Sequence, residues 1–165
     1  MNLILIGMPG CGKSTIGVIL AKSLAYDFID SDLLIQRRAG GMTLQAILDQ
    51  QGQDAFRALE NRVNASIDCD HTVIATGGSV IYCPEAMEHL RSIGMVLYLR
   101  VAYEEIARRV GDFHSRGVVL ASGQDLRALY EERLPLYERW ADHTVDWTGQ
   151  SAEQLVAEIV QKLTK

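Results

Sequence analysis

Residues 7–15 combine residue types and a spacing that can bind phosphate groups. They read GMPGCGKST and match the pattern GxxxxGK[ST] in full. Glycines allow backbone N–H groups to converge on an anion, and Lys13 can carry a positive charge to the outer phosphates of a nucleotide. The hydroxyl of Ser14 is a suitable ligand for the Mg²⁺ ion that accompanies ATP. The predicted nucleotide-binding residues of the loop are Gly10, Cys11, Gly12, Lys13, Ser14 and Thr15.

The segments on either side of this loop support that interpretation. Residues 2–6 form an apolar run, which predicts a buried strand leading into the loop. After the loop, apolar residues recur at helical spacing, at Ile16, Ile19, Leu20 and Leu24. A helix that begins at the loop adds the partial positive charge of its N-terminus to the anion site. The alternative is a glycine-rich turn without a ligand, which would not require both neighbouring elements.

Two aspartates, Asp30 and Asp32, follow a second, weaker strand pattern at residues 28–29. The carboxyl ends of parallel strands border the ligand crevice, and residues i and i+2 of an extended segment point the same way. Phosphoryl transfer needs an anion near Mg²⁺ and a group that orients or deprotonates the acceptor hydroxyl. The pair can serve both purposes. Alternatively, the two residues cap a helix or form a turn, as Asp often does.

Two arginines lie on predicted helices where they can bind an anionic acceptor. Arg57 shares a helix with the apolar residues Phe56, Leu59 and Val63, and Arg133 lies in the segment EERLPLY. An arginine at the edge of an apolar helix face can bind a carboxylate with two parallel hydrogen bonds. The alternative for Arg57 is a solvated pair with Glu60, and for Arg133 a surface charge.

Glycines mark two further segments. Gly77 and Gly78 follow an apolar run at residues 72–75, so their backbone amides can approach a ligand closely, unless they form only a structural turn. Residues 111–124 have little apolar pattern and contain three glycines, which predicts a mobile loop. Arg116 on such a lid can neutralise charge on the transferred phosphoryl group, although a surface arginine is the simpler interpretation. Arg108 or Arg109, after the run at 95–99, can reach the nucleotide or remain exposed.

Composition limits the classes of protein to consider. The chain has 165 residues, 48% of them hydrophobic, which predicts one domain spanning residues 1–165. A net charge of −5 argues against nucleic acid as the main partner. The three scattered cysteines fit neither a disulfide framework nor a metal site. Without a signal or membrane-spanning pattern, we expect a cytoplasmic protein that does not bind membranes and acts as a monomer.

Short apolar runs alternate with segments of helical period along the whole chain. The runs at 2–6, 28–29, 72–75, 95–99 and 144–145 predict strands. Helical stripes predict helices between them, including one through Leu126, Tyr130, Leu134 and Tyr137 with a kink at Pro135, and a last one at residues 152–163. This alternation predicts an α/β fold with a parallel sheet covered on both faces.

Taken in order, these motifs resemble those of the shikimate kinase family over nearly the whole chain. They are the phosphate loop, the DSD segment at 30–32, the FRALE segment at 56–60, the TGGS turn at 76–79, Arg116 and the ERLPLY segment at 132–137. The resemblance implies the three-layer P-loop kinase fold of nucleoside-monophosphate kinases, with a five-stranded parallel sheet in the order 2-3-1-4-5. It also implies substrate-binding helices at about 31–64 and a lid at about 111–124.

The same resemblance implies roles for individual residues. Asp30 would support Mg²⁺, and Asp32 would contact the acceptor hydroxyls and act as the base. Arg57 and Arg133 would hold the acceptor carboxylate, and Gly77 and Gly78 would contact the same substrate. Arg116 would close over the phosphates. Apart from the resemblance, we assign Arg109 rather than Arg108 to the nucleotide because of its position after the run at 95–99. The implied reaction is the ATP-dependent phosphorylation of shikimate to shikimate 3-phosphate.

Two departures from the family pattern affect the acceptor more than the nucleotide. The lid reads RGVVL, where the family usually has RPLL, and Ser79 stands where the family usually has a third glycine. Alternatives are a kinase for another hydroxy acid or a gluconate-type sugar acid, and a regulatory module that binds nucleotide without turnover. A nucleoside-monophosphate kinase fits less well because its longer lid and base-reading segment are not evident.

Overall fold

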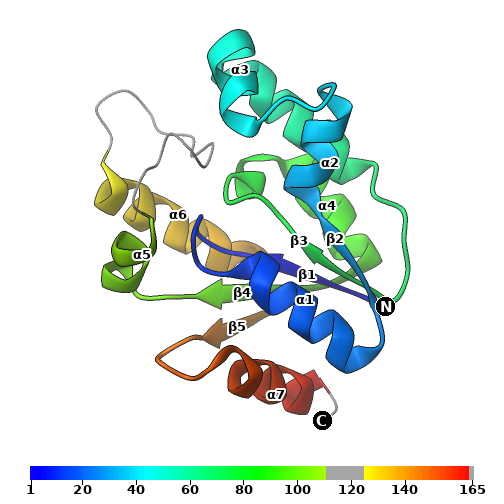
Figure 1. Ribbon diagram of the computed structural model, residues 1–165, viewed down its shortest axis with the longest axis vertical. Helices are drawn as coiled ribbons and strands as arrows, with labels where there is room; N and C mark the ends of the chain where they lie inside the picture. Colours follow the sequence, from blue (N-terminus) through cyan, green and yellow to red (C-terminus); the bar gives the residue numbers. More distant parts are fainter. Residues whose placement is uncertain (111–124, 164–165) are drawn as a thin grey trace.

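Five strands form the central sheet of the computed structural model, which describes residues 1–110 and 125–163 (Figure 1). They are β1 (Asn2–Ile6), β2 (Asp27–Asp30), β3 (Thr72–Ala75), β4 (Gly94–Arg100) and β5 (His143–Asp146). Their order across the sheet is β2-β3-β1-β4-β5, and each neighbouring pair is parallel. The predicted sheet and its order are therefore confirmed.

The central strand β1 is apolar from Leu3 to Ile6 because helices cover both faces of the sheet. All residues of β1 are buried, and its Leu5 pairs with Ala75 of β3 on one side and Leu97 of β4 on the other. The side chain of Asn2 joins the beginnings of these strands. It accepts a hydrogen bond from the Thr72 backbone (3.0 Å) and donates to the Ile93 carbonyl (3.1 Å). These bonds satisfy a polar side chain that is buried among apolar residues.

Helices form a layer on each face of the sheet (Figure 1). One layer contains α1 (Lys13–Leu24) and α7 (Ala152–Leu163), which pack against each other. The other contains α4 (Pro84–Ile93) and α6 (Leu126–Trp140), which both contact β4, with the short 3₁₀ helix η1 (Val80–Tyr82) beside them. The helix α5 (Tyr103–Arg109) contacts α6. This arrangement confirms the predicted three-layer α/β fold.

The predicted apolar stripe of α6 is partly wrong. The buried residues of this helix are Leu126, Leu129, Arg133 and Tyr137, so a charged side chain occupies a core position. Tyr130 and Leu134 are only half-buried, and the helix continues through Pro135. The apolar pattern misassigned the buried face because it counted only apolar residues, whereas the helix buries its arginine.

Two helices, α2 (Ser31–Arg38) and α3 (Leu44–Ala65), form a small second core away from the sheet. This core contains Ile35, Ile47, Phe56 and Val63. The side chain of Thr43 caps α3, and Gly52 interrupts its helical backbone with φ = 84°, a value that favours glycine. Figure 1 shows α3 extending beyond the sheet. Among the described residues, no helix is both long and apolar enough to cross a bilayer.

Candidate active site

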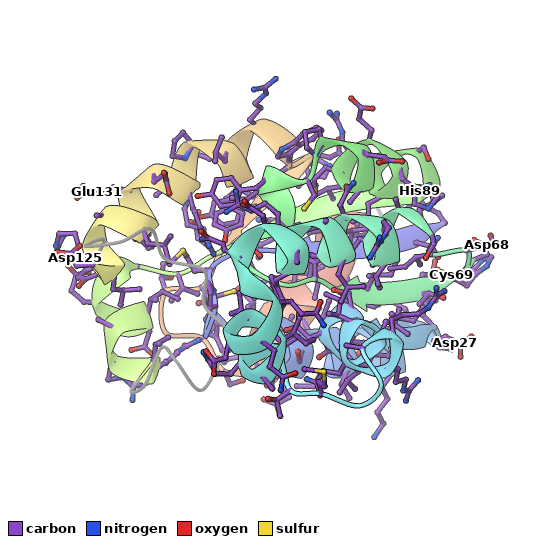
Figure 2. All side chains as sticks on the ribbon, turned by 90° about the horizontal axis from the view of Figure 1, so that it is seen from above. Asp27, Asp68, Cys69, His89, Asp125 and Glu131 are labelled. Atoms are coloured by element: carbon purple, nitrogen blue, oxygen red, sulfur yellow. The ribbon has the colours of Figure 1, made fainter. Side chains whose placement is uncertain are left out.

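A cavity of about 660 Å³ lies where the phosphate loop, the turn after β3 and the helices α2, α3 and α6 meet. Its lining includes most of the predicted site: Gly10, Gly12, Lys13, Ser14, Thr15, Asp32, Gly77, Gly78, Arg109 and Arg133. It therefore occupies the carboxyl end of the strands, where parallel sheets bind ligands. Figure 2 shows Asp27, the first residue of β2, and Asp68, which precedes β3, at the opposite end of the molecule from Asp125 and Glu131 at the beginning of α6.

Some of the predicted residues lie elsewhere. Of the residues that the structure describes, Cys11, Asp30 and Arg57 do not line the cavity. Cys11 is fully buried beneath the phosphate loop, and all three cysteines are free thiols. Arg116 and the predicted lid at 111–124 lie outside the described residues.

The phosphate loop is held in shape by its own groups. Gly10 and Gly12 have φ angles of 78° and 96°, and Gly12 is the residue from which α1 begins. Lys13 is 8% exposed, and its ammonium group donates hydrogen bonds to the carbonyls of Gly7 (2.8 Å) and Met8 (2.9 Å). The lysine charge is therefore satisfied by carbonyl groups of the loop itself.

A hydrogen-bonded chain joins the loop to the first turn of α2. The hydroxyl of Ser14 donates to one oxygen of Asp30 (2.7 Å), and the other oxygen accepts the backbone N–H of Asp32 (3.0 Å). Asp30 thus caps α2, and Asp32 lies within that helix. The prediction that both aspartates share an extended segment was wrong, because the strand ends at Asp30. The helical turn nevertheless keeps the two carboxyl groups close together.

Asp32 is a half-buried acid on the wall of the cavity. Burial raises the pKa of its carboxyl group to about 6, with a further contribution from the negative charge of Asp30, while the charge of Lys13 acts in the opposite direction. A carboxylate with a pKa near 6 is ionised at neutral pH and is a stronger base than an ordinary aspartate.

Glu60 is a second acid of the cavity, and it was not predicted as a site residue. Its side chain is 1% exposed and lines the cavity, and burial raises the pKa of its carboxyl group to about 7. It accepts a 2.5 Å hydrogen bond from the hydroxyl of Ser79, which lowers that pKa. The interpretation of Glu60 as the solvated partner of Arg57, on the helix face opposite the apolar residues, was wrong, because α3 buries Glu60 together with Phe56 and Val63.

The glycines of the turn after β3 lie where no side chain would fit. A Cβ atom on Gly77 would lie 2.7 Å from a carboxylate oxygen of Glu60 and 2.9 Å from one of Asp32. A Cβ atom on Gly78 would lie 2.7 Å from the ring of Pro9. The next residue, Ser79, fits because its side chain points to Glu60. The departure at this position therefore adds a hydrogen bond to an acid of the site.

The two predicted carboxylate-binding arginines have different environments. Arg133 is 1% exposed and lines the cavity, which excludes the alternative of a surface charge. Arg57 is half-buried, and its guanidinium group lies over the ring of Tyr82, at 4.6 Å from the ring centroid. Both arginines lower the pKa of Glu60 through their charge, so all three groups belong to one electrostatic cluster.

Arg109, rather than Arg108, borders the cavity. Its Nη1 atom donates to the carbonyl of Cys11 (3.2 Å), and its guanidinium group lies over the ring of Trp147 at 4.4 Å from the centroid. Trp147 also lines the cavity, next to Gly12. Trp147 was not predicted as a site residue. Its position directly after the last strand is the only signal in the sequence. Arg108 is exposed and pairs with Glu105.

These features together define a P-loop kinase for a small molecule. The loop provides the phosphate site, and the raised-pKa acid and the buried arginine lie in the same cavity. Comparisons with known proteins show to which family within this class the chain belongs.

The family model for shikimate kinase matches residues 9–164. A shikimate kinase from Synechococcus sp. is 40% identical over 167 aligned positions, covering 98% of this chain and 84% of that protein. One from Thiobacillus denitrificans is 36% identical over 98% of this chain and 90% of that protein. A solved structure of shikimate kinase from Acinetobacter baumannii, in complex with shikimate, has a TM-score of 0.88 at 33% identity, covering 99% of this chain and 92% of that one. The chain belongs to the shikimate kinase family, and it is an ATP-dependent kinase.

Proposed function

We propose that this chain transfers the γ-phosphoryl group of Mg·ATP to a ring hydroxyl of shikimate, giving ADP and shikimate 3-phosphate. The observation that carries the proposal is that one cavity joins a phosphate loop to Asp32 and Arg133. The nucleotide's γ-phosphate would lie between the loop and the acid, within reach of a hydroxyl of an acceptor anchored at the arginine. The family membership supports shikimate over a gluconate-type acceptor.

Residues of the loop would hold the nucleotide. Lys13 would exchange its bonds to the carbonyls of Gly7 and Met8 for phosphate oxygens, and the N-terminus of α1 would add backbone N–H donors. Arg109 and Trp147 line the same end of the cavity and are available to the nucleotide base.

The residues present fit a magnesium ion. The Ser14 hydroxyl and the Asp30 carboxylate lie 2.7 Å apart, and both are the oxygen ligands that Mg²⁺ prefers. Within residues 1–110 and 125–163 no group of three or more acidic, histidine or cysteine side chains could hold a metal ion. Mg²⁺ in kinase sites is usually held by one or two protein oxygen ligands together with substrate phosphates and water. When bound, the ion would neutralise charge on the phosphates.

The acceptor would be held by groups at the other end of the cavity. Arg133, assisted by Arg57, would bind its carboxylate, and the backbone of Gly77 and Gly78 would contact its ring hydroxyls. Asp32 would accept the proton of the attacking hydroxyl as the oxygen–phosphorus bond forms and the bond to ADP breaks. We extend to Arg116 the role that the family resemblance implies, closure over the phosphates.

An assay of ADP release with Mg·ATP, shikimate and a panel of other hydroxy acids and sugars tests this proposal. We expect turnover with shikimate, and far lower turnover with acceptors that lack a carboxylate. Preferred turnover with a gluconate-type acid would replace the acceptor but keep the reaction. Tight ATP binding without transfer to any acceptor would favour a regulatory module. We also propose that the chain acts as a monomer, which sedimentation under assay conditions checks.

A further inference from the structure

The ring of Tyr82 contacts both Arg57 and Arg133, the two predicted carboxylate-binding residues. The guanidinium carbon of Arg57 lies 4.6 Å from the ring centroid, and that of Arg133 lies 5.3 Å from it. The arginines come from α3 and α6, whereas Tyr82 is the last residue of η1. One half-buried aromatic ring thus contacts two cations from two different helices.

The electrostatics of this cluster explain why a ring is useful there. Two guanidinium groups that serve one carboxylate repel each other whenever the acceptor is absent. The negative face of an aromatic ring attracts cations within about 6 Å, and it does so without occupying their N–H groups. A guanidinium group that contacts a ring through its face can still offer its edge to the two parallel bonds that a carboxylate accepts. The buried Nε of Arg57 has no hydrogen-bond partner among the described residues, which agrees with a guanidinium group held by its face.

The ring of Tyr82 is held by its hydroxyl group on one side and by the backbone of η1 on the other. Its hydroxyl donates a 2.7 Å hydrogen bond to Glu132, the residue that precedes Arg133 on α6. Burial, together with this bond, raises the pKa of the Tyr82 hydroxyl, so the group remains a donor at neutral pH. On the other side, η1 directly follows the turn that contains Gly78 and Ser79. The ring is therefore connected to the turn, to α6 and to both cations.

We propose that Tyr82 is a positioning residue that holds Arg57 and Arg133 in place for the carboxylate of the acceptor. Tyr82 does not line the cavity in the part of the chain that the structure describes, so it acts through the arginines. The inference rests on the proposed function, because it requires an acceptor with a carboxylate.

The test compares Tyr82→Leu and Tyr82→Gln, which remove the ring, with Tyr82→Phe, which keeps the ring and loses the hydroxyl with its contacts to Glu132 and Arg133. We expect the first two to raise KM for shikimate about 5- to 30-fold, the range for a partly desolvated cation–π contact, with kcat and KM for ATP changed less than about twofold. Tyr82→Phe should stay within about threefold of the wild type. A matched control is Tyr103→Leu, because Tyr103 also has an arginine over its ring, Arg127 at 4.0 Å, but that arginine, unlike Arg133, does not line the cavity.

A second readout isolates the carboxylate. The preference for shikimate over the analogue with its carboxylate reduced to an alcohol should shrink in the two ringless variants and persist in Tyr82→Phe. An unchanged KM and preference in folded ringless variants would overturn the positioning role, as would a parallel loss of kcat, ATP affinity and thermal stability. If the wild type does not phosphorylate shikimate, the proposed function fails first. The test then uses the best carboxylated acceptor of the panel in place of shikimate. Equal KM values for that acceptor in the wild type and in the ringless variants would still overturn the positioning role of Tyr82.

Discussion

The two ends of the cavity are built in different ways. At the nucleotide end, glycines with positive φ angles and backbone carbonyls shape a loop of consecutive residues, and Lys13 is bonded within it. At the acceptor end, side chains from α2, α3, η1 and α6 bring two acids with raised pKa values next to two arginines. The comparison shows that backbone geometry can fix a phosphate site locally, whereas recognition of the acceptor depends on the packing of distant segments.

The largest expected effect comes from Asp32, which belongs to the acceptor end. Asp32→Asn should lower kcat by about 10²- to 10⁴-fold, the range for loss of a general base, with ATP affinity nearly unchanged. In the wild type, kcat/KM should fall as the pH drops through about 6, because protonation of Asp32 removes the base. Steady-state kinetics and ATP titration measure both effects. Normal turnover in this variant would remove Asp32 from the mechanism.

The second-largest effect concerns Glu60, whose ionised side chain lowers the free energy of unfolding. Its pKa is about 7 in the folded state against an ordinary 4.5, so the folded state binds this proton more tightly than the unfolded state. The contribution of Glu60 to stability should therefore fall as pH rises from about 4.5 through 7. Relative to the wild type, Glu60→Gln should gain about 3 kcal/mol over this interval.

Denaturant unfolding of both proteins at several pH values measures this gain. The exposed Glu153→Gln serves as the control for the loss of one carboxylate away from the cavity. A constant difference between Glu60→Gln and the wild type would mean that Glu60 has an ordinary pKa.

Arg57 tests whether the acceptor end recognises a carboxylate. Arg57→Ala should raise KM for shikimate by about 10- to 100-fold, because it removes one of the two cations while Arg133 remains. KM for ATP should stay near the wild-type value. A variant that changes only ATP affinity would contradict the division of the cavity into two ends.

The smallest effect should come from Ser79. Ser79→Ala removes the hydroxyl that donates to Glu60 and should cost about 1 kcal/mol of stability. Because that bond lowers the pKa of Glu60, the variant should also shift the pH dependence of stability to higher pH. Ser66→Ala, which loses a bond to the carbonyl of Val63, is the matched control. Identical pH profiles for both variants would show that Ser79 does not affect the acid.

The fold and the nucleotide end could be predicted because their signals are local in the chain. The apolar runs gave all five strands, and the phosphate loop carries its geometry in glycines at fixed spacing. The sheet order came from the family resemblance, since strand patterns alone do not specify it.

The acceptor end was predicted less well because its chemistry arises from burial. Glu60 and Arg133 look like surface charges in the sequence, yet each is 1% exposed. Tyr82 and Trp147 carry no motif, and they acquire a role only when the fold places arginines over their rings. The environment of a charged residue depends on residues far away in the chain, which periodicity does not report.

The buried acid Glu60 has a further consequence for calorimetry. An anionic acceptor placed beside it would raise its pKa above the value of about 7, since a second negative charge disfavours ionisation. Acceptor binding near neutral pH would then take up protons from the buffer. The heat of binding would vary with the ionisation enthalpy of that buffer, and the apparent affinity would weaken in alkaline solution.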